Sequence, residues 1–157
     1  MTRPTIYATT KTLWCMREKI DSTVDDARII VLDPHHSDRK GDLCVVQGMH
    51  TVPFPIERVF YIYDVPAAAE RGVHSHIRDH ELIVAVSGSF AVKVDDGSRS
   101  RVFQLKRPYE MLHIPPGLWV QLCDFSSGSV AMVMCRYGYD KNDYINDYSE
   151  YIKHKQI

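Results

Sequence analysis

The chain has 157 residues, of which 45% are hydrophobic and 25% are charged, and its formal net charge is −1. A chain this close to neutrality has no global basic field for nucleic acid, and no apolar run approaches the ~20 residues of a membrane helix. The start of the chain lacks a signal peptide's apolar core, and the four cysteines form no CxxC pair. We therefore expect one cytoplasmic globular domain with reduced thiols.

Runs of β-branched and aromatic residues between turn residues predict strands along most of the chain. The expected strands are 28–32, 43–46, 58–65, 82–86, 90–94, 101–105, 111–114, 118–122 and 129–135. A single helix is expected over 142–152, because Tyr144, Tyr148 and Ile152 recur at every fourth position and Asn142 or Asp143 can cap it. Many short strands with turns every eight to twelve residues predict an all-β sandwich or barrel.

The stretch from Arg71 to Glu81 carries the densest chemistry in the chain and leads into the apolar run 82–86. Alternate side chains of an extended segment share a face, so His74 and His76 are expected to point the same way. Imidazole titrates near neutrality and also binds metals, so this pair indicates proton transfer or metal binding. His80 stands between two acidic residues, and an ordinary surface ion pair is an equal alternative for it.

The spacing of the central stretch, His74-x-His76-x4-Glu81-x6-Gly88, resembles the first motif of the cupins. Pro115-x-Gly117 resembles the start of their second motif, but Val120 stands where metal-binding cupins have a further histidine. Three possible ligands remain, and three ligands with an open position can hold a catalytic metal. A metal-dependent cupin enzyme that uses His74, His76 and Glu81 therefore stays open as an alternative.

A closer resemblance covers nearly the whole chain and points to the nucleotide-sugar 3,4-ketoisomerases, the WxcM-like cupins. It is carried by separated segments in the family's order: Tyr61-Ile62-Tyr63-Asp64-Val65-Pro66, Arg71-Gly72-Val73-His74-Ser75-His76, Val86-Ser87-Gly88-Ser89, Ile114-Pro115-Pro116-Gly117-Leu118-Trp119 and Tyr144-Ile145-Asn146-Asp147-Tyr148. The family commonly has Ala where this chain has Ser75, and Gln where it has Glu81.

The resemblance implies a single cupin domain over residues 1–157, a jelly-roll barrel or double-stranded β-helix with a short C-terminal helix. It implies conversion of a dTDP-4-keto-6-deoxy-hexose to its 3-keto isomer without metal or organic cofactor, on the way to an amino-deoxy sugar of a bacterial surface glycan such as the O-antigen of lipopolysaccharide. It also implies a homodimer, in which we expect residues 1–26 to exchange as an arm and add a strand to the partner's sheet.

Moving a carbonyl from C4 to C3 takes two proton transfers through an enediolate, which suits His. By resemblance we expect His74 and His76 to be the acid/base pair, with the residue that removes the C3 proton left open. Arg71 is the candidate contact for the oxyanion or the diphosphate, and Tyr61 and Tyr63 are candidates for sugar contact or proton relay.

Further candidate substrate contacts are His80, Trp119 and Arg136. For Trp119 a core position is the favoured alternative, because large aromatic side chains are usually buried. His113 lies between apolar residues and is interpreted as a hydrogen-bonded core histidine. A cupin that binds a sugar or effector without catalysis remains the competing function from a different class.

Overall fold

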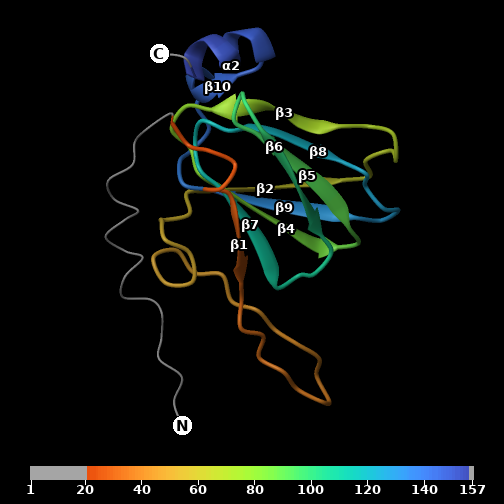
Figure 1. Ribbon diagram of the computed structural model, residues 1–157. Coiled ribbons are helices and arrows are strands. Elements are labelled where there is room, and N and C mark those ends of the chain that lie inside the picture. The colour runs from red at the N-terminus through yellow and green to blue at the C-terminus, as the bar shows by residue number, and fades with distance from the viewer. Residues whose placement is uncertain (1–20, 156–157) are drawn as a thin grey trace.

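The computed structural model describes residues 21–155, which form two five-stranded antiparallel sheets that face each other (Figure 1). One sheet has the order β1-β7-β4-β9-β2 and the other β10-β3-β8-β5-β6. The strands are β1 (Arg28–Val31), β2 (Arg58–Tyr63), β3 (Arg71–His76), β4 (Glu81–Ser87), β5 (Phe90–Asp95), β6 (Ser100–Leu105), β7 (Glu110–Ile114), β8 (Trp119–Cys123), β9 (Val130–Cys135) and β10 (Tyr144–Ile145). The all-β prediction with one short C-terminal helix is confirmed.

The main hydrophobic core lies between the two sheets. Along β4, Ile83 and Ala85 point into this core, while Leu82 and Val84 belong to a second apolar cluster on the outer face of the same sheet. The strand is therefore buried on both faces, which accounts for its unbroken apolar run. Its position at the centre of the five-stranded sheet gives the preceding residues a rigid support.

The outer cluster is covered by the long segment 32–57, which contributes Val52, Phe54 and Ile56. The strand expected at 43–46 is wrong: in this region Leu43 makes only an isolated bridge with His35. Cys44 and Val46 are half-buried against the cluster, while Leu43 and Val45 are exposed. The alternating pattern here serves to cover a sheet, not to extend one.

The C-terminal helix α2 (Tyr148–Lys155) lies over the second sheet, next to β10 (Figure 1). It buries Tyr151 with Trp119 and Ile145, and the hydroxyl of Tyr151 donates to the carbonyl of Gly117 at 3.2 Å. The predicted helix start is wrong by six residues, because the 3₁₀ helix η1 (Lys141–Asp143) and strand β10 come first.

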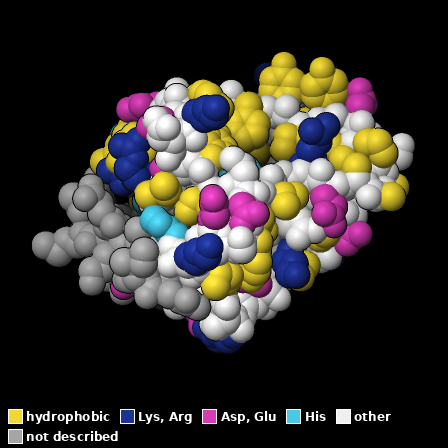
Figure 2. All heavy atoms as spheres, turned by 90° about the horizontal axis from the view of Figure 1, so that it is seen from above, with side chains coloured by type: hydrophobic (Ala, Val, Ile, Leu, Met, Phe, Trp, Pro, Cys, Tyr) yellow, Lys and Arg dark blue, Asp and Glu magenta, His cyan; other side chains and the backbone are white. Residues whose placement is uncertain are grey.

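The described part of the expected N-terminal arm packs against its own chain. Val24 is buried, and its N–H donates to the carboxylate of Asp96 at 3.0 Å. Residues 1–20 of the arm lie outside the described residues, so strand exchange stays a prediction. Between residues 21 and 155 no helix is long and apolar enough to span a membrane. The face that carries α2 mixes acidic, basic and hydrophobic side chains without a large patch of one charge (Figure 2).

Candidate active site

The pairing of β3 with its neighbours directs His74 and His76 into the space between the sheets. His74 lies opposite Val120, a residue of the main core, and His76 lies opposite Tyr144. Ser75 lies opposite Trp119 and faces the helix side, as strand alternation predicts. The two imidazole rings meet edge to face, with their centroids 4.9 Å apart.

A β-bulge at Gly72–His74 shapes the start of the site. Val73 has a φ of 53°, which is unusual for a β-branched residue, and Gly72 has a φ of 81°. A Cβ on Gly72 would lie 3.2 Å from the carbonyl oxygen of Val120, so a larger residue fits poorly. Because of the extra residue in the bulge, Arg71 lies opposite Leu122. Leu122 and Val120, the partner of His74, both belong to the main core, so Arg71 and His74 share one face of the sheet.

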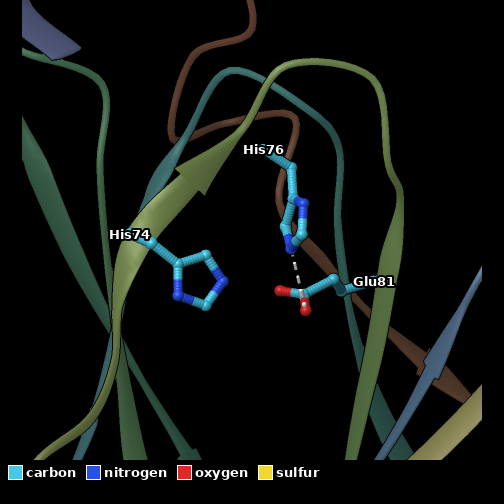
Figure 3. Close-up of side chains that lie close together, drawn as sticks. All are labelled: His74, His76 and Glu81. Atoms are coloured by element: carbon cyan, nitrogen blue, oxygen red, sulfur yellow. Dashed lines mark ion pairs between the residues drawn. The ribbon is translucent and has the colours of Figure 1, made fainter. Parts of the chain in front are cut away.

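Glu81, the first residue of β4, completes a cluster of three side chains that point toward one another from two strands (Figure 3). The Oε1 of Glu81 lies 3.4 Å from the Nε2 of His76, and both side chains are buried. The Nδ1 of His74 donates to the carbonyl oxygen of Gly72 at 2.8 Å. Because a carbonyl can only accept, the Nδ1 of His74 carries the proton and the Nε2 of neutral His74 is an acceptor.

Asp143 is a site residue that the sequence did not reveal as such. Its Oδ2 accepts a 2.8 Å hydrogen bond from the Nδ1 of His76. The same carboxylate accepts from the backbone N–H groups of Arg78 at 2.7 Å and Asp79 at 3.2 Å. From the sequence, Asp143 is predicted only as a possible helix cap, because 67 positions separate it from His76.

The two histidines have opposite electrostatic surroundings. Burial lowers the pKa of His74 below its usual 6.5. Burial also opposes the charge of His76, but the carboxylates of Asp143 and Glu81 outweigh it and raise the pKa of His76 to about 9. Burial likewise opposes ionisation of Glu81, yet His76 keeps the pKa of that carboxyl below its ordinary value. Near pH 7, the site therefore pairs a neutral His74 with a cationic His76.

Arg58 and Tyr144 are two further polar side chains near the histidines. The Nη2 of Arg58 donates to the buried Asp79 at 3.0 Å, its Nε and Nη1 are buried, and Cys135 and Tyr144 are further electrostatic neighbours of the guanidinium. The ring of Tyr144 lies 4.4 Å from that of His76 and 5.0 Å from that of His74, between centroids. These groups offer hydrogen-bond donors to a ligand that reaches the histidines.

The structure does not bring the predicted tyrosines to this cluster. Phe60 and Ile62 pack against the main core, so Tyr61 and Tyr63 lie on the outer face of β2, where they are 64% and 58% exposed. Within one chain, Tyr61 and Tyr63 therefore do not point toward a sugar bound beside His74.

The other predicted substrate contacts also lie apart from His74 and His76. His80 is buried on the outer side of the sheet, where its Nδ1 lies 3.0 Å from the Nε2 of His113 and its ring packs near Phe54. Trp119 is buried under α2, which agrees with the core interpretation. Arg136 donates its backbone N–H to the carbonyl of His80.

Among residues 21–155, two groups of side chains have donor atoms close enough for a metal ion. His74, His76 and Glu81 form one group and His76, Asp79 and Asp143 the other, with the atoms of each group within 4.8 Å of one another. In the first group, the position opposite His74 is occupied by Val120, which cannot be a ligand. On this face, the described residues therefore offer three protein ligands as a group.

Two facing antiparallel sheets with polar residues at the inner end of a packed core define a cupin-type barrel. The family model described as "FdtA: WxcM-like, C-terminal" matches residues 15–156, so the chain belongs to this family.

Relatives that are named as oxoisomerases or ketoisomerases agree with this family. The chain is 35% identical over 117 residues to the TDP-4-oxo-6-deoxy-alpha-D-glucose-3,4-oxoisomerase of Aneurinibacillus thermoaerophilus, covering 74% of this chain and 84% of that relative. The structure of a 3,4-ketoisomerase from Helicobacter canadensis matches with a TM-score of 0.81 and 30% identity, over 84% of this chain and 98% of the other. The sugar 3,4-ketoisomerase QdtA from Thermoanaerobacterium thermosaccharolyticum, in complex with TDP, matches with a TM-score of 0.82 and 30% identity, over 85% and 97%.

Proposed function

We propose that this protein is a sugar 3,4-ketoisomerase that interconverts TDP-4-keto-6-deoxyglucose and a TDP-3-keto-6-deoxyhexose. The observation that carries the proposal is the interior pair of His74 and His76, one neutral and one cationic, in a chain whose relatives are named for this reaction. A variant of the related QdtA has been solved in complex with TDP-4-keto-6-deoxyglucose, which supports this substrate class.

The proposed reaction needs no net oxidant or reductant. A base removes the proton at C3, the electron pair of that C–H bond forms a C3–C4 double bond, and the C4 carbonyl pair moves onto O4. The enediolate then loses the proton of O3, the O3 pair forms the new carbonyl at C3, and C4 takes up a proton. Each transfer suits an imidazole, whose pKa lies close to neutrality.

The developing charge on the enediolate oxygens needs hydrogen-bond donors that are already in place. We assign this role to Arg58, because its guanidinium nitrogens are buried and its charge acts on both His74 and Tyr144. Arg71, which is exposed and shares a sheet face with His74, is the candidate for the diphosphate. Tyr144 is the candidate for a sugar hydroxyl, because its ring lies beside both imidazoles.

A carbon label tests the proposed reaction directly. TDP-4-keto-6-deoxyglucose with ¹³C at C4 is mixed with the purified protein and followed by NMR. On isomerisation, the labelled C4 changes from a carbonyl carbon to a carbinol carbon, and a new carbonyl forms at the unlabelled C3. A sugar that binds, as judged by chemical-shift changes, but keeps its label in the carbonyl form would favour the non-catalytic binding alternative.

The metal-dependent alternative is favoured by one observation, the closeness of His74, His76 and Glu81. Metal analysis of active protein separates it from the proposal, because a metal-dependent enzyme would carry stoichiometric Fe, Mn or Ni.

We further propose a homodimer and a cytoplasmic location, in a pathway to an amino-deoxy sugar of a bacterial surface glycan. Light scattering at micromolar concentration tests the dimer, and a monomer there would count against it.

A further inference from the structure

The carboxylate of Asp143 is fixed at the corner between β3 and β4. Asp143 is 5% exposed and ends η1, far along the chain from the strands it joins. Two backbone N–H groups, those of Arg78 and Asp79, donate to it and hold its orientation. Its third partner is the Nδ1 of His76 at 2.8 Å. Such a carboxylate is a preorganised acceptor that does not need to reorient when a proton moves nearby.

This contact fixes how His76 presents its second nitrogen. An ionised carboxylate can only accept, so the Nδ1 of His76 carries a proton and donates it to Asp143. Rotating the ring would leave the buried Asp143 without this donor, which is costly. The Nε2 of His76 is consequently directed toward Glu81 (Figure 3). His74, in contrast, is held by the backbone carbonyl of Gly72 and bears no ion pair at Nδ1.

We propose that Asp143 is a positioning residue of the isomerase site, which holds His76 through Nδ1 and thereby makes the Nε2–H of His76 the proton donor and the Nε2 of His74 the proton acceptor. The inference rests on the proposed function. The charged and titratable groups around His76 belong to six elements or turns: Asp143, Glu81, His74, Asp79, Arg58 and Tyr144.

The two histidines then have complementary proton cycles. The Nε2 of His74 takes the proton from C3, while the Nε2–H of His76 gives its proton to O4 as the enediolate forms. In the second half, His74 returns its proton to C4 and His76 recovers one from the O3 hydroxyl. Both imidazoles end in their starting states, and the sugar has exchanged its carbonyl and carbinol positions. Asp143 stays ionised throughout and touches only His76.

The variant Asp143→Asn tests this role, because an amide keeps the size of the side chain and one oxygen, which can still accept from the backbone N–H of Arg78. The matched control is Asp140→Asn, which removes a carboxylate from the same segment. The carboxylate of Asp140 contacts Arg78 and not His76. We expect Asp143→Asn to lower kcat about 10²-fold, the scale of impaired acid/base catalysis. KM should stay within about threefold, since a positioning residue adds little to ground-state binding. Asp140→Asn should leave both constants unchanged.

Proton NMR of ¹⁵N-histidine-labelled protein gives a readout that a merely structural role would not move. In the wild type, the Nδ1–H of His76 should give a far-downfield signal, typical of an imidazole bonded to a buried carboxylate. Asp143→Asn should shift or remove this signal, and Asp140→Asn should keep it. An unchanged signal or an unchanged kcat in Asp143→Asn overturns the proposal.

The wild-type spectrum decides the point even if Asp143→Asn does not fold, because absence of the downfield Nδ1–H signal in the wild type also overturns the proposal. The isomerase function and the positioning role of Asp143 can be refuted separately. If the wild type does not turn over the keto sugar, the proposed function is wrong, while the NMR signal still reports whether Asp143 holds His76.

Discussion

His74 and Val120 lie directly opposite each other on β3 and β8, on the face of the sheet that lines the barrel interior. The apolar side chain of Val120 therefore occupies the position opposite His74, where a further metal ligand would be needed. Of the remaining donors, His76 and Glu81 already form an ion pair with each other, and the Nδ1 of His74 donates to the carbonyl oxygen of Gly72. This arrangement favours acid/base chemistry by the side chains themselves.

The first prediction concerns metal removal. Treatment with a chelator followed by desalting should leave kcat for the keto sugar unchanged, because His76 and Glu81 are partners of each other. Turnover before and after treatment, with metal content measured on the same samples, checks this. Activity that is lost with the chelator and restored by Fe, Mn or Ni would transfer the chemistry to a metal on these three residues.

The second prediction concerns the histidine pair. His74→Asn and His76→Asn should each lower kcat by ~10² or more, the usual scale for a lost acid/base group. The matched control is His50→Asn, a change of an exposed histidine in the segment 32–57, which should keep full activity. Steady-state kinetics on folded proteins checks this, and full activity in both site variants would move the chemistry away from β3.

The third prediction concerns pH. The pKa of His76 is raised to about 9 and that of His74 is lowered below 6.5, so the active combination of charged His76 and neutral His74 exists between these limits. The pH profile of kcat/KM should have a plateau around neutrality and fall as pH rises through about 9. A profile that falls on the alkaline side near 6.5 would show that His76 is not held as a cation.

The raised pKa of His76 also predicts how stability depends on pH. Because the folded-state pKa lies above the unfolded value of 6.5, the stabilising effect is fully present below pH 6.5 and is lost as pH rises through about 9. Thermal unfolding of the wild type should show Tm decreasing across this range. The decrease should be smaller in His76→Asn, and an equal decrease in both proteins would contradict the assignment.

The fourth prediction concerns Ser75, which lies between the two histidines of β3. Its side chain is fully buried on the helix side of β3, and among the described residues its hydroxyl makes one long 3.5 Å contact, with the carbonyl of His76. Ser75→Ala should therefore leave kcat and KM unchanged and alter the free energy of unfolding by at most about 1 kcal/mol. Kinetics and denaturant unfolding test this, and a large fall in kcat would mean that the residue affects the histidine geometry.

Local sequence patterns predicted most of the sheet and the shared face of His74 and His76, because strand alternation is a local property. Alternation also placed Tyr61 and Tyr63 together, but it cannot say which face of β2 points inward. Packing of Phe60 and Ile62 into the core decides that question, and it depends on the opposite sheet.

The C-terminal part of the site could not be predicted from local pattern. The four-residue spacing that begins at Tyr144 is typical of a helix, yet Tyr144 pairs with His76 in a strand and the helix begins only at Tyr148. The carboxylate of Asp147 accepts from the N–H of Glu150 and stabilises that later start. The contact between Asp143 and His76 likewise follows from how this segment returns to β3.

The most direct test of the central claim is NMR of TDP-4-keto-6-deoxyglucose with the protein in D₂O. With the wild type, the C3 proton signal of the substrate should disappear while a 3-keto product forms. Deuterium enters C4 if the base exchanges with solvent and stays out if His74 carries the same proton across. The double variant His74→Asn/His76→Asn should give neither change. An unaltered substrate spectrum with the wild type, or equal conversion by the double variant, would contradict the account.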